Sequence, residues 1–584
     1  MKAGTESFGT LVAEAYHGTL RLPAFQRPWK WQRRQVISLF DSLRKRYPIG
    51  TLLFLQARGD LNLSPRLFDG APANTANDLQ RYVLDGQQRL TAGIALFHGG
   101  GNDASTRYFL DLNKLWDLCN EHAVDFGNEE RVAAFAEDLD DEDGYCVPSR
   151  SNASADQLLA NNHLLWTATL TDETKLQRAA DTYNDKYKDR KEFFNFFIRP
   201  FFKPAPTVNL PTITLDEHES IEAVTKIFAT LNTSGTSLTP FEIVVATLFP
   251  TGIDLRQDVA DNQEATTYYR HMDASGELYL QTIALLADQS PKKIKLPKTI
   301  TSDRYRAWGD KAVQMLDDLG EFLSNRLGVG LDVGPSLVPY DAMFPPMAVL
   351  LARSKSWGLT GLQRTACDAR FERWFVAAAL SQRYSEGTHN KQEGDIREMT
   401  PWLENGDNLQ PNWLRDFQMP RLITASPNGA IGRLISCLMN RERPRDLLTK
   451  EPVGYYREAK SATERHHIFP SKFCQDHIPD WSKNDEANVA LNSMFTDSST
   501  NRRWSKMDPA NQVNDIEEAT PDLNARATLL EKHGVREDAI EVMRKPGKTR
   551  LEFVRFLEAR EKFFVAKFGE WGLAGAPIPL DEDS

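Results

Sequence analysis

The hydrophobic pattern of the chain changes near residue 255, and this change limits the fold more than any other feature. Before it, short apolar runs typical of strands alternate with amphipathic helical stretches, such as 33–47. The strand-like runs are 18–25, 49–57, 81–85, 107–112 and 210–216. Between 256 and 450 the apolar residues recur almost only at helical spacing. The pattern therefore predicts a mixed α/β N-terminal part followed by a helical part.

The length of the chain predicts several domains, because 584 residues exceed what one hydrophobic core usually contains. We expect an α/β domain over 1–255, a helical domain over 256–450 and a third domain over 451–584. The third domain should finish with a long helix over 549–571. The expected fold class is thus multidomain α/β plus α.

The composition favours an ordinary globular protein, with 41% hydrophobic and 26% charged residues. No run approaches the roughly 18 apolar residues that cross a bilayer, and the first residues contain no apolar signal core. The five cysteines include no CxxC pair, which argues against a disulfide framework or a four-cysteine zinc site. We therefore expect a cytoplasmic protein without a membrane partner.

The charge of the chain is unevenly distributed, although its net value is −11. Residues 21–47 contain eight basic residues against the single acid Asp41, and aromatic residues are interleaved with them. The basic residues are Arg21, Arg27, Lys30, Arg33, Arg34, Arg44, Lys45 and Arg46. Such a segment is the best electrostatic footprint for a nucleic acid in this sequence. A solvated helix face is the alternative interpretation.

The stretch RYVLDGQQRLTAGIALF, residues 81–97, joins a buried strand to an apolar helix through a very polar corner. Asp85 is placed to cap the helix, and Gln88 three residues later completes a capping-box pattern. In a second interpretation, the N–H groups at the helix start and the neighbouring Arg89 face an anion. These residues alone do not decide between the two.

The clearest chemistry lies in 462–507, which contains adjacent histidines followed by Ile-Phe-Pro and later by asparagines. A histidine that activates water, with a nearby histidine and asparagine holding a divalent cation, is what phosphodiester hydrolysis requires. Neighbouring side chains on a strand point to opposite faces, so His466 and His467 need a turn or twist to act together.

The motif HHIFP…NVAL…TNRRWS resembles the HNH, or His-Me finger, nuclease motif, in which a β-hairpin and a helix hold one metal ion. The resemblance implies His467 as general base, His466 and Asn501 as metal ligands, and Asn488 as the residue that steadies the hairpin. Asn492 is an alternative to Asn501 as ligand. The family more commonly has Asp or Glu at position 466, where histidine suits a softer ion.

Four motifs in the first half resemble the GmrS half of GmrSD-type enzymes, which are type IV, modification-dependent restriction proteins with a ParB/sulfiredoxin-like fold. They are LPAFQRPWKW, YPIGTLLF, VLDGQQRLTA and IFATLNTSGTSLTPFEIV. The nucleotide-binding residues that the resemblance implies are Asp85, Gly86, Gln87, Gln88, Arg89, Arg27 and Asn232, with Thr233 and Ser234 in the same turn. The residues expected to sense modified DNA are Phe25, Gln26, Trp29, Lys30, Arg33 and Arg34. Arg27 could belong to either set.

Two functions follow as hypotheses. The first is a DNA endonuclease that senses a base or backbone modification on double-stranded DNA. It would bind and hydrolyse GTP or ATP in its N-terminal domain and cut with Mg²⁺ or Mn²⁺ in its C-terminal domain. The second is a non-catalytic ParB-like nucleotide switch that binds DNA or a partner and has a degenerate nuclease fold. The oligomeric state stays open, with a homo-oligomer as one arrangement.

Overall fold

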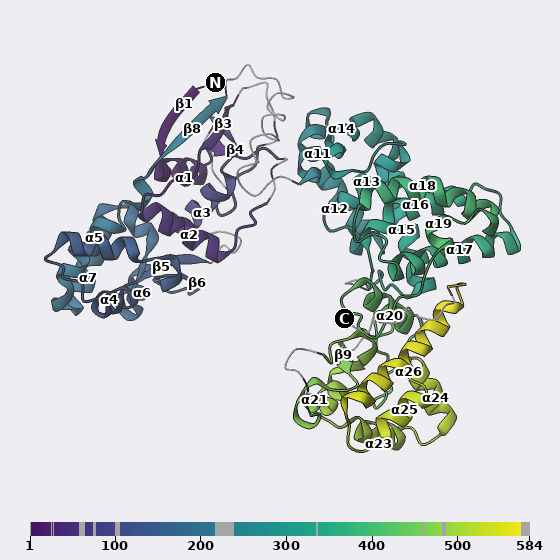
Figure 1. Cartoon of the computed structure of the whole chain (residues 1–584). Coiled ribbons are helices and arrows are strands. Elements are labelled where there is room, and N and C mark those ends of the chain that lie inside the picture. The colour runs from purple at the N-terminus through teal and green to yellow at the C-terminus, as the bar shows by residue number, and fades with distance from the viewer. Residues whose placement is uncertain are drawn as a thin grey trace. The chain divides into compact units, whose positions relative to one another are not determined.

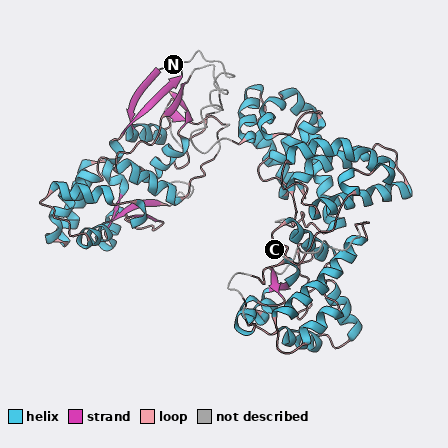
Figure 2. Cartoon of the chain, viewed as in Figure 1, coloured by secondary structure: helices cyan, strands magenta, loops and turns pink. Residues whose placement is uncertain are grey.

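The chain folds into two compact units, residues 1–254 and 255–584 (Figure 1). The structure is a computed structural model, and it describes residues 2–24, 26, 28–57, 63, 65–73, 78–99, 106–215, 239–333, 337–459, 462–479, 481 and 486–573. Helices predominate among these residues, and the strands belong to three small sheets (Figure 2). The mixed α/β character expected from the sequence is confirmed.

The first unit is built around a five-stranded mixed sheet with the order β1-β8-β3-β4-β2. β1 pairs antiparallel with β8, β8 parallel with β3, β3 antiparallel with β4, and β4 parallel with β2. The strands are β1 Lys2–Ser7, β2 Leu20–Arg21, β3 Leu52–Gln56, β4 Arg81–Asp85 and β8 Asn209–Leu215. Helices α1 Phe8–His17, α2 Arg33–Arg44 and α3 Gln87–Phe97 follow β1, β2 and β4 along the chain. The strand–helix alternation of the sequence thus produces one sheet and its covering helices.

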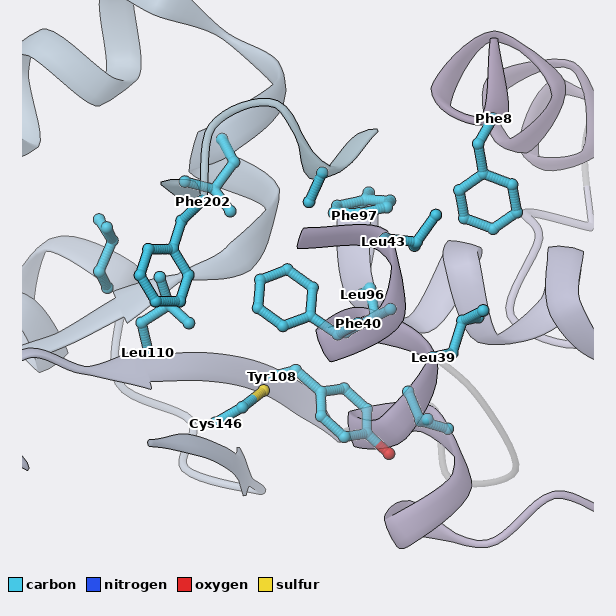
Figure 3. Packing of buried hydrophobic residues seen from close by; sticks show 14 of the residues in the cluster. Phe8, Leu39, Phe40, Leu43, Leu96, Phe97, Tyr108, Leu110, Cys146 and Phe202 are labelled. Atoms are coloured by element: carbon cyan, nitrogen blue, oxygen red, sulfur yellow. The ribbon is translucent and has the colours of Figure 1, made fainter. Parts of the chain in front are cut away.

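A second, antiparallel sheet with the order β6-β5-β7 lies in the same unit. Its strands are β5 Arg107–Asp111, β6 Cys146–Ser149 and β7 Leu164–Trp166. The surrounding helices include α4 Leu112–Glu121, α5 Glu129–Asp138, α6 Ala155–Asn162 and α7 Glu173–Lys186. Buried side chains from both parts share one core, in which Phe40 of α2 lies near Tyr108 of β5 and Phe202 (Figure 3).

The second unit is largely helical. The central helices α13 Glu277–Leu286, α15 Ser302–Leu327 and α16 Phe344–Ser354 pack against one another. Helices α12 Leu255–Ala265, α17 Gly361–Leu380, α18 Thr388–Asn405 and α20 Ala430–Arg441 complete this part. After residue 450 come the hairpin β9 Thr463–His467 and β10 Ser493–Asp497, and the helices α21 Ser471–His477, α22 Ser498–Trp504, α23 Pro509–Ala519, α24 Leu523–Glu531, α25 Glu537–Arg544 and α26 Arg550–Gly569. The expected domain boundary near 451 stays a prediction, because both parts lie within this one unit.

Helix α11 Pro240–Leu248 begins with a capping box, in which Thr239 is the cap, Glu242 completes the box and Pro240 occupies the first turn. All five cysteines are buried and unbridged. In the described part of the chain, no helix combines the length and the apolar character needed to cross a membrane.

Candidate functional site

The histidine motif folds into a regular β-hairpin followed directly by a helix. In the antiparallel pairing of β9 and β10, His467 lies opposite Ser493 and His466 opposite Met494. Helix α22 begins at the residue after β10 and packs against β9. Because side chains alternate along a strand, Glu464 and His466 share one face of β9, and this face lies toward α22.

Asn501 of α22 contacts both side chains on that face. Its Oδ1 lies 2.9 Å from Nδ1 of His466, and its Nδ2 donates a hydrogen bond to the carboxylate of Glu464. The other ring nitrogen of His466, Nε2, lies 3.4 Å from Oε1 of Gln512 on α23. His466 is only 1% exposed, and this burial lowers the pKa of its imidazole to about 4. The structure thus brings together the two predicted metal ligands.

The hydrogen bonds among Glu464, His466 and Asn501 cannot all be satisfied without one additional positive charge. Gln512 Nε2 donates to the carbonyl oxygens of Ile468 and Met507, so its Oε1 must accept from Nε2–H of His466. A neutral imidazole then turns the lone pair of Nδ1 toward Oδ1 of Asn501, which is also an acceptor. If the amide of Asn501 is turned by 180°, its Nδ2 donates to Nδ1 of His466, but its Oδ1 then faces the carboxylate of Glu464, which is also an acceptor. A cation among these three side chains removes it.

The donor set suits a hard or borderline divalent ion, because it combines one imidazole nitrogen with amide and carboxylate oxygens. Glu464 was not among the ligands expected from the sequence; its place two residues before His466, on the same face of the strand, is the signal that could have found it. Among the described residues, no group of three or more His, Cys, Asp or Glu side chains is arranged to hold a metal ion. The third side chain of this cluster is the amide of Asn501.

His467 occupies the opposite face of β9. Its Nδ1 lies 3.4 Å from the Oγ of Ser471, the first residue of α21, and its side chain is partly exposed. The pairing stays regular through His467, which is the last residue of β9, and the chain bends at Ile468 and Phe469 directly after it. The charge of His467 contributes to lowering the pKa of His466.

The structure gives the hairpin-steadying role to Asn492 rather than to Asn488. The amide of Asn492 is fully buried, accepts from the backbone N of Phe469 at 2.9 Å and donates to the carbonyl oxygens of Phe469 and Ala487. Asn488 is exposed instead. These bonds also occupy Asn492, which leaves Asn501 as the ligand candidate. The expectation for Asn488 is wrong because two asparagines four residues apart cannot be told apart without the backbone path.

A buried aspartate that sequence reasoning missed holds α22 in place. Asp446 is fully buried, and its Oδ1 accepts from the Oγ1 of Thr500 at 2.8 Å, while its Oδ2 accepts from the backbone N of Asp497 at 2.9 Å. Asp497 in turn caps α22 through the backbone N of Thr500. Asn501 is the next residue, so this network positions the ligand candidate.

The polar corner before α3 differs from the expected capping box. The helix begins at Gln87, and its cap position is Gly86, with φ of 101° and no side-chain cap. Asp85 instead accepts a hydrogen bond from Arg89 Nη2 at 2.8 Å. Arg89 also donates to the carbonyl oxygens of Ile49 and Thr51. The expected Asp85–Gln88 capping box is therefore wrong, because the left-handed Gly86 takes the cap position, one residue beyond Asp85.

Two buried glutamines bind the 26–31 segment to this corner. Gln26 Nε2 donates to the carbonyl oxygens of Val83 and Leu84 in β4, at 2.5 and 3.0 Å. Gln88 Oε1 accepts from the backbone N of Lys30 and of Trp31, at 2.8 and 3.2 Å. We call these four bonds the glutamine clamp. The motifs FQRPWKW and DGQQR, 50 or more residues apart, therefore form one structural piece.

The basic segment offers fewer charges to a ligand than its sequence indicates. Arg44 is buried and donates to Asp41 and to the carbonyl oxygens of Ala136 and Leu139. Arg34 pairs with Glu142 and Lys30 with Glu242, whereas Arg33 is exposed at the start of α2.

Two of the residues expected to sense DNA are used by the fold itself. The ring of Trp29 lies in the hydrophobic core, 8% exposed, and the amide of Gln26 is engaged in the glutamine clamp. Neither side chain offers a surface for stacking, so both expectations are corrected. Phe25, Arg27 and Asn232, with Thr233 and Ser234, lie outside the described residues.

Comparison with known proteins identifies the first unit. Residues 8–249 match the family model described as GmrSD restriction endonuclease, N-terminal domain. This stretch is similar to the N-terminal domain of GmrSD restriction endonucleases. The match contains both the glutamine clamp and the corner at Gly86, and it supports a restriction endonuclease of the GmrSD type. The resemblance inferred from the four sequence motifs is thereby confirmed for the N-terminal half.

Over nearly its whole length the chain also resembles a protein from an archaeon. It is 23% identical over 622 aligned residues to "Uncharacterized protein MJ0686" of Methanocaldococcus jannaschii, and the alignment covers 97% of this chain and 98% of that protein. The alignment therefore extends over both the residues that match the family model and the C-terminal region with the hairpin.

Proposed function

We propose that the chain is a modification-dependent DNA endonuclease of the GmrSD type, whose phosphodiester hydrolysis takes place at the β9–β10 hairpin. The observation that supports this most directly is the group of Glu464, His466 and Asn501, which lacks one positive charge. A hairpin followed by a helix, with His467 at the end of its first strand, is the arrangement expected of an HNH nuclease centre.

The residues divide the work between binding a metal ion and moving a proton. His466 and Asn501 would hold a divalent ion, Mg²⁺ or Mn²⁺, with the carboxylate of Glu464 beside them. When bound, the ion neutralises charge that develops on the phosphate and on the leaving oxygen. His467 accepts the proton of the attacking water at Nε2, because Nδ1 faces the Ser471 hydroxyl, which fixes the orientation of the ring.

The N-terminal domain would bind GTP or ATP at the start of α3. The first N–H groups of this 11-residue helix have no side-chain cap, and Gly86 brings the backbone close without a side chain. Because Arg89 and Gln88 are held by the surrounding backbone, their role in this proposal is to shape the site. A modified base or backbone on double-stranded DNA would be sensed by the same domain, with Lys30, Arg33 and Arg34 exposed at its basic segment.

Metal binding and cleavage test the proposal together. Calorimetric titration of Mn²⁺ into the wild type should show one site that is lost in Asn501→Ala and His466→Ala but kept in His477→Ala, an exposed histidine away from the cluster. Modified plasmid, with Mg²⁺ or Mn²⁺ and with or without GTP, should be cut by the wild type and not by His467→Ala. Metal binding without any cleavage of modified DNA would favour a non-catalytic nucleotide switch.

A further inference from the structure

We propose that Arg465 and Arg433 hold a phosphate group of the DNA strand on the face of β9 that carries His467. This inference rests on the proposed nuclease function, and it assigns the contact with substrate to residues outside the histidine–asparagine motif.

Arg465 lies two residues before His467 on β9, so both side chains extend from the same face, about 7 Å apart along the strand. Its guanidinium is partly buried and reaches helix α20 and the loop before it. Nη1 lies 3.1 Å from the carbonyl oxygen of Pro427 and 3.4 Å from Oδ1 of Asn428, and Nη2 lies 3.5 Å from the Oγ of Ser436. All of these partners are neutral acceptors.

Arg433 adds a second positive charge beside the first. It lies on α20 three residues before Ser436, on the same side of that helix, and its side chain is exposed. Its Nη1 donates to the carbonyl oxygen of Val338 at 3.0 Å. Arg465 reaches Ser436, which lies one turn along α20 from Arg433.

No acid neutralises this pair in the part of the chain that the structure describes. Three other arginines of the same region form ion pairs with acids. The pairs are Arg503 with Asp515, Arg550 with Glu486, and Arg421 with Glu561. Two neighbouring guanidinium groups that bond only to neutral oxygens favour an anion from outside. The planar fork of arginine matches the oxygens of a phosphate, and a phosphate held here lies next to the water that His467 would activate.

The salt dependence of DNA binding tests the inference without any cleavage. The full-length protein is titrated with an unmodified fluorescent DNA duplex in EDTA at several salt concentrations. Each phosphate contact contributes about 0.9 to the slope of log K against log salt. Because both arginines hold the same phosphate, the double variant should lower the slope by about 0.9, and each of Arg465→Gln and Arg433→Gln by part of that amount. The matched control is Arg536→Gln, whose arginine is paired with Glu531 and should leave the slope unchanged.

Kinetics and metal binding separate this role from a structural one. With Mn²⁺ and cleavable DNA, Arg465→Gln should raise KM while its Mn²⁺ affinity stays at the wild-type value, and Arg465→Lys should recover part of the loss. The inference is overturned, even if the wild type cuts DNA, when Arg465→Gln, Arg433→Gln and the double variant all keep the wild-type slope. If the wild type cuts no DNA but the slopes fall as expected, the nuclease proposal fails and the phosphate contact stands.

Discussion

Oδ1 of Asp446 accepts a hydrogen bond from the hydroxyl of Thr500 at 2.8 Å, although 54 residues separate them in the chain. The segment before the hairpin thus holds the helix that presents Asn501. Asp446→Asn would place an amide N–H against the backbone N–H of Asp497 or against the backbone N–H groups of Leu448 and Thr449. We expect a loss of about 3 kcal/mol in unfolding free energy, as for a buried charged acceptor, and weaker Mn²⁺ binding. Chemical denaturation measures the unfolding free energy and calorimetry measures Mn²⁺ binding. Asp476→Asn, at an exposed position, is the control.

The two asparagines of the hairpin loop should differ sharply in their effect on stability. Asn492→Ala leaves the backbone N of Phe469 and two carbonyl oxygens without their partner, and we expect a cost of about 3 kcal/mol. Asn488→Ala removes an exposed side chain and should change the unfolding free energy by less than about 0.5 kcal/mol. Equal effects in a denaturant titration would show that the loop is not held by Asn492.

The corner before α3 should tolerate no side chain at position 86. Gly86 has φ of 101°, and a Cβ atom there would lie 2.0 Å from Cδ2 of Leu52. Gly86→Ala therefore combines backbone strain with overpacking, and we expect a loss of about 3 kcal/mol. Gly144→Ala is the matched control, because Gly144 also has a positive φ but no atom within 4 Å; it should lose about 1 kcal/mol. Thermal unfolding of both variants gives the comparison.

His533 should make the second unit sensitive to acid. It is fully buried, its Nε2 lies 2.9 Å from the carbonyl oxygen of Arg445, and burial lowers its pKa to about 4. Because the folded-state pKa lies below the unfolded value of about 6.5, the stabilisation is fully present above pH 6.5 and is lost as the pH falls toward 4. In His533→Gln, the stability lost over this range should be smaller by about 3 kcal/mol. An unchanged pH profile in urea denaturation would contradict this assignment.

Arg89 should hold both the loop before β3 and the side chain of Asp85 in place. Arg89→Lys keeps a positive charge but cannot reach Ile49, Thr51 and Asp85 together, so the unfolding free energy should fall by about 2 kcal/mol. If the nucleotide proposal is right, GTP or ATP binding should weaken as well. Isothermal titration with each nucleotide, beside a denaturation curve, distinguishes lost binding from lost folding.

Long periodic segments were predictable from the sequence, and single polar contacts were less so. Helices α2 and α26 lie where the apolar spacing predicted them, and α13 and α15 lie in the region predicted to be helical, since burial of one helix face determines both pattern and structure. Strand β1, with the sequence KAGTES, has no apolar alternation and forms because it pairs with β8. Its existence depends on a partner about 200 residues away.

The same distinction applies to the candidate site. The pairing of His466 with Asn501 was expected from the motif, because a hairpin and the helix after it are local in sequence. Asp446 and Gln512 lie outside the motif, and only the folded backbone brings them to it. Gly86 took the cap position from Asp85 because a left-handed turn ends the strand, which the spacing of polar residues alone does not reveal.

The glutamine clamp has a consequence for how such chains diversify. Gln26 and Gln88 bond only to backbone atoms of the segments they join, and backbone atoms are the same whatever side chain a residue bears. Substitutions at Lys30, Arg33 or Arg34 therefore leave the clamp intact. The chemistry of this segment's surface can therefore change while the hydrogen bonds that hold the segment stay the same.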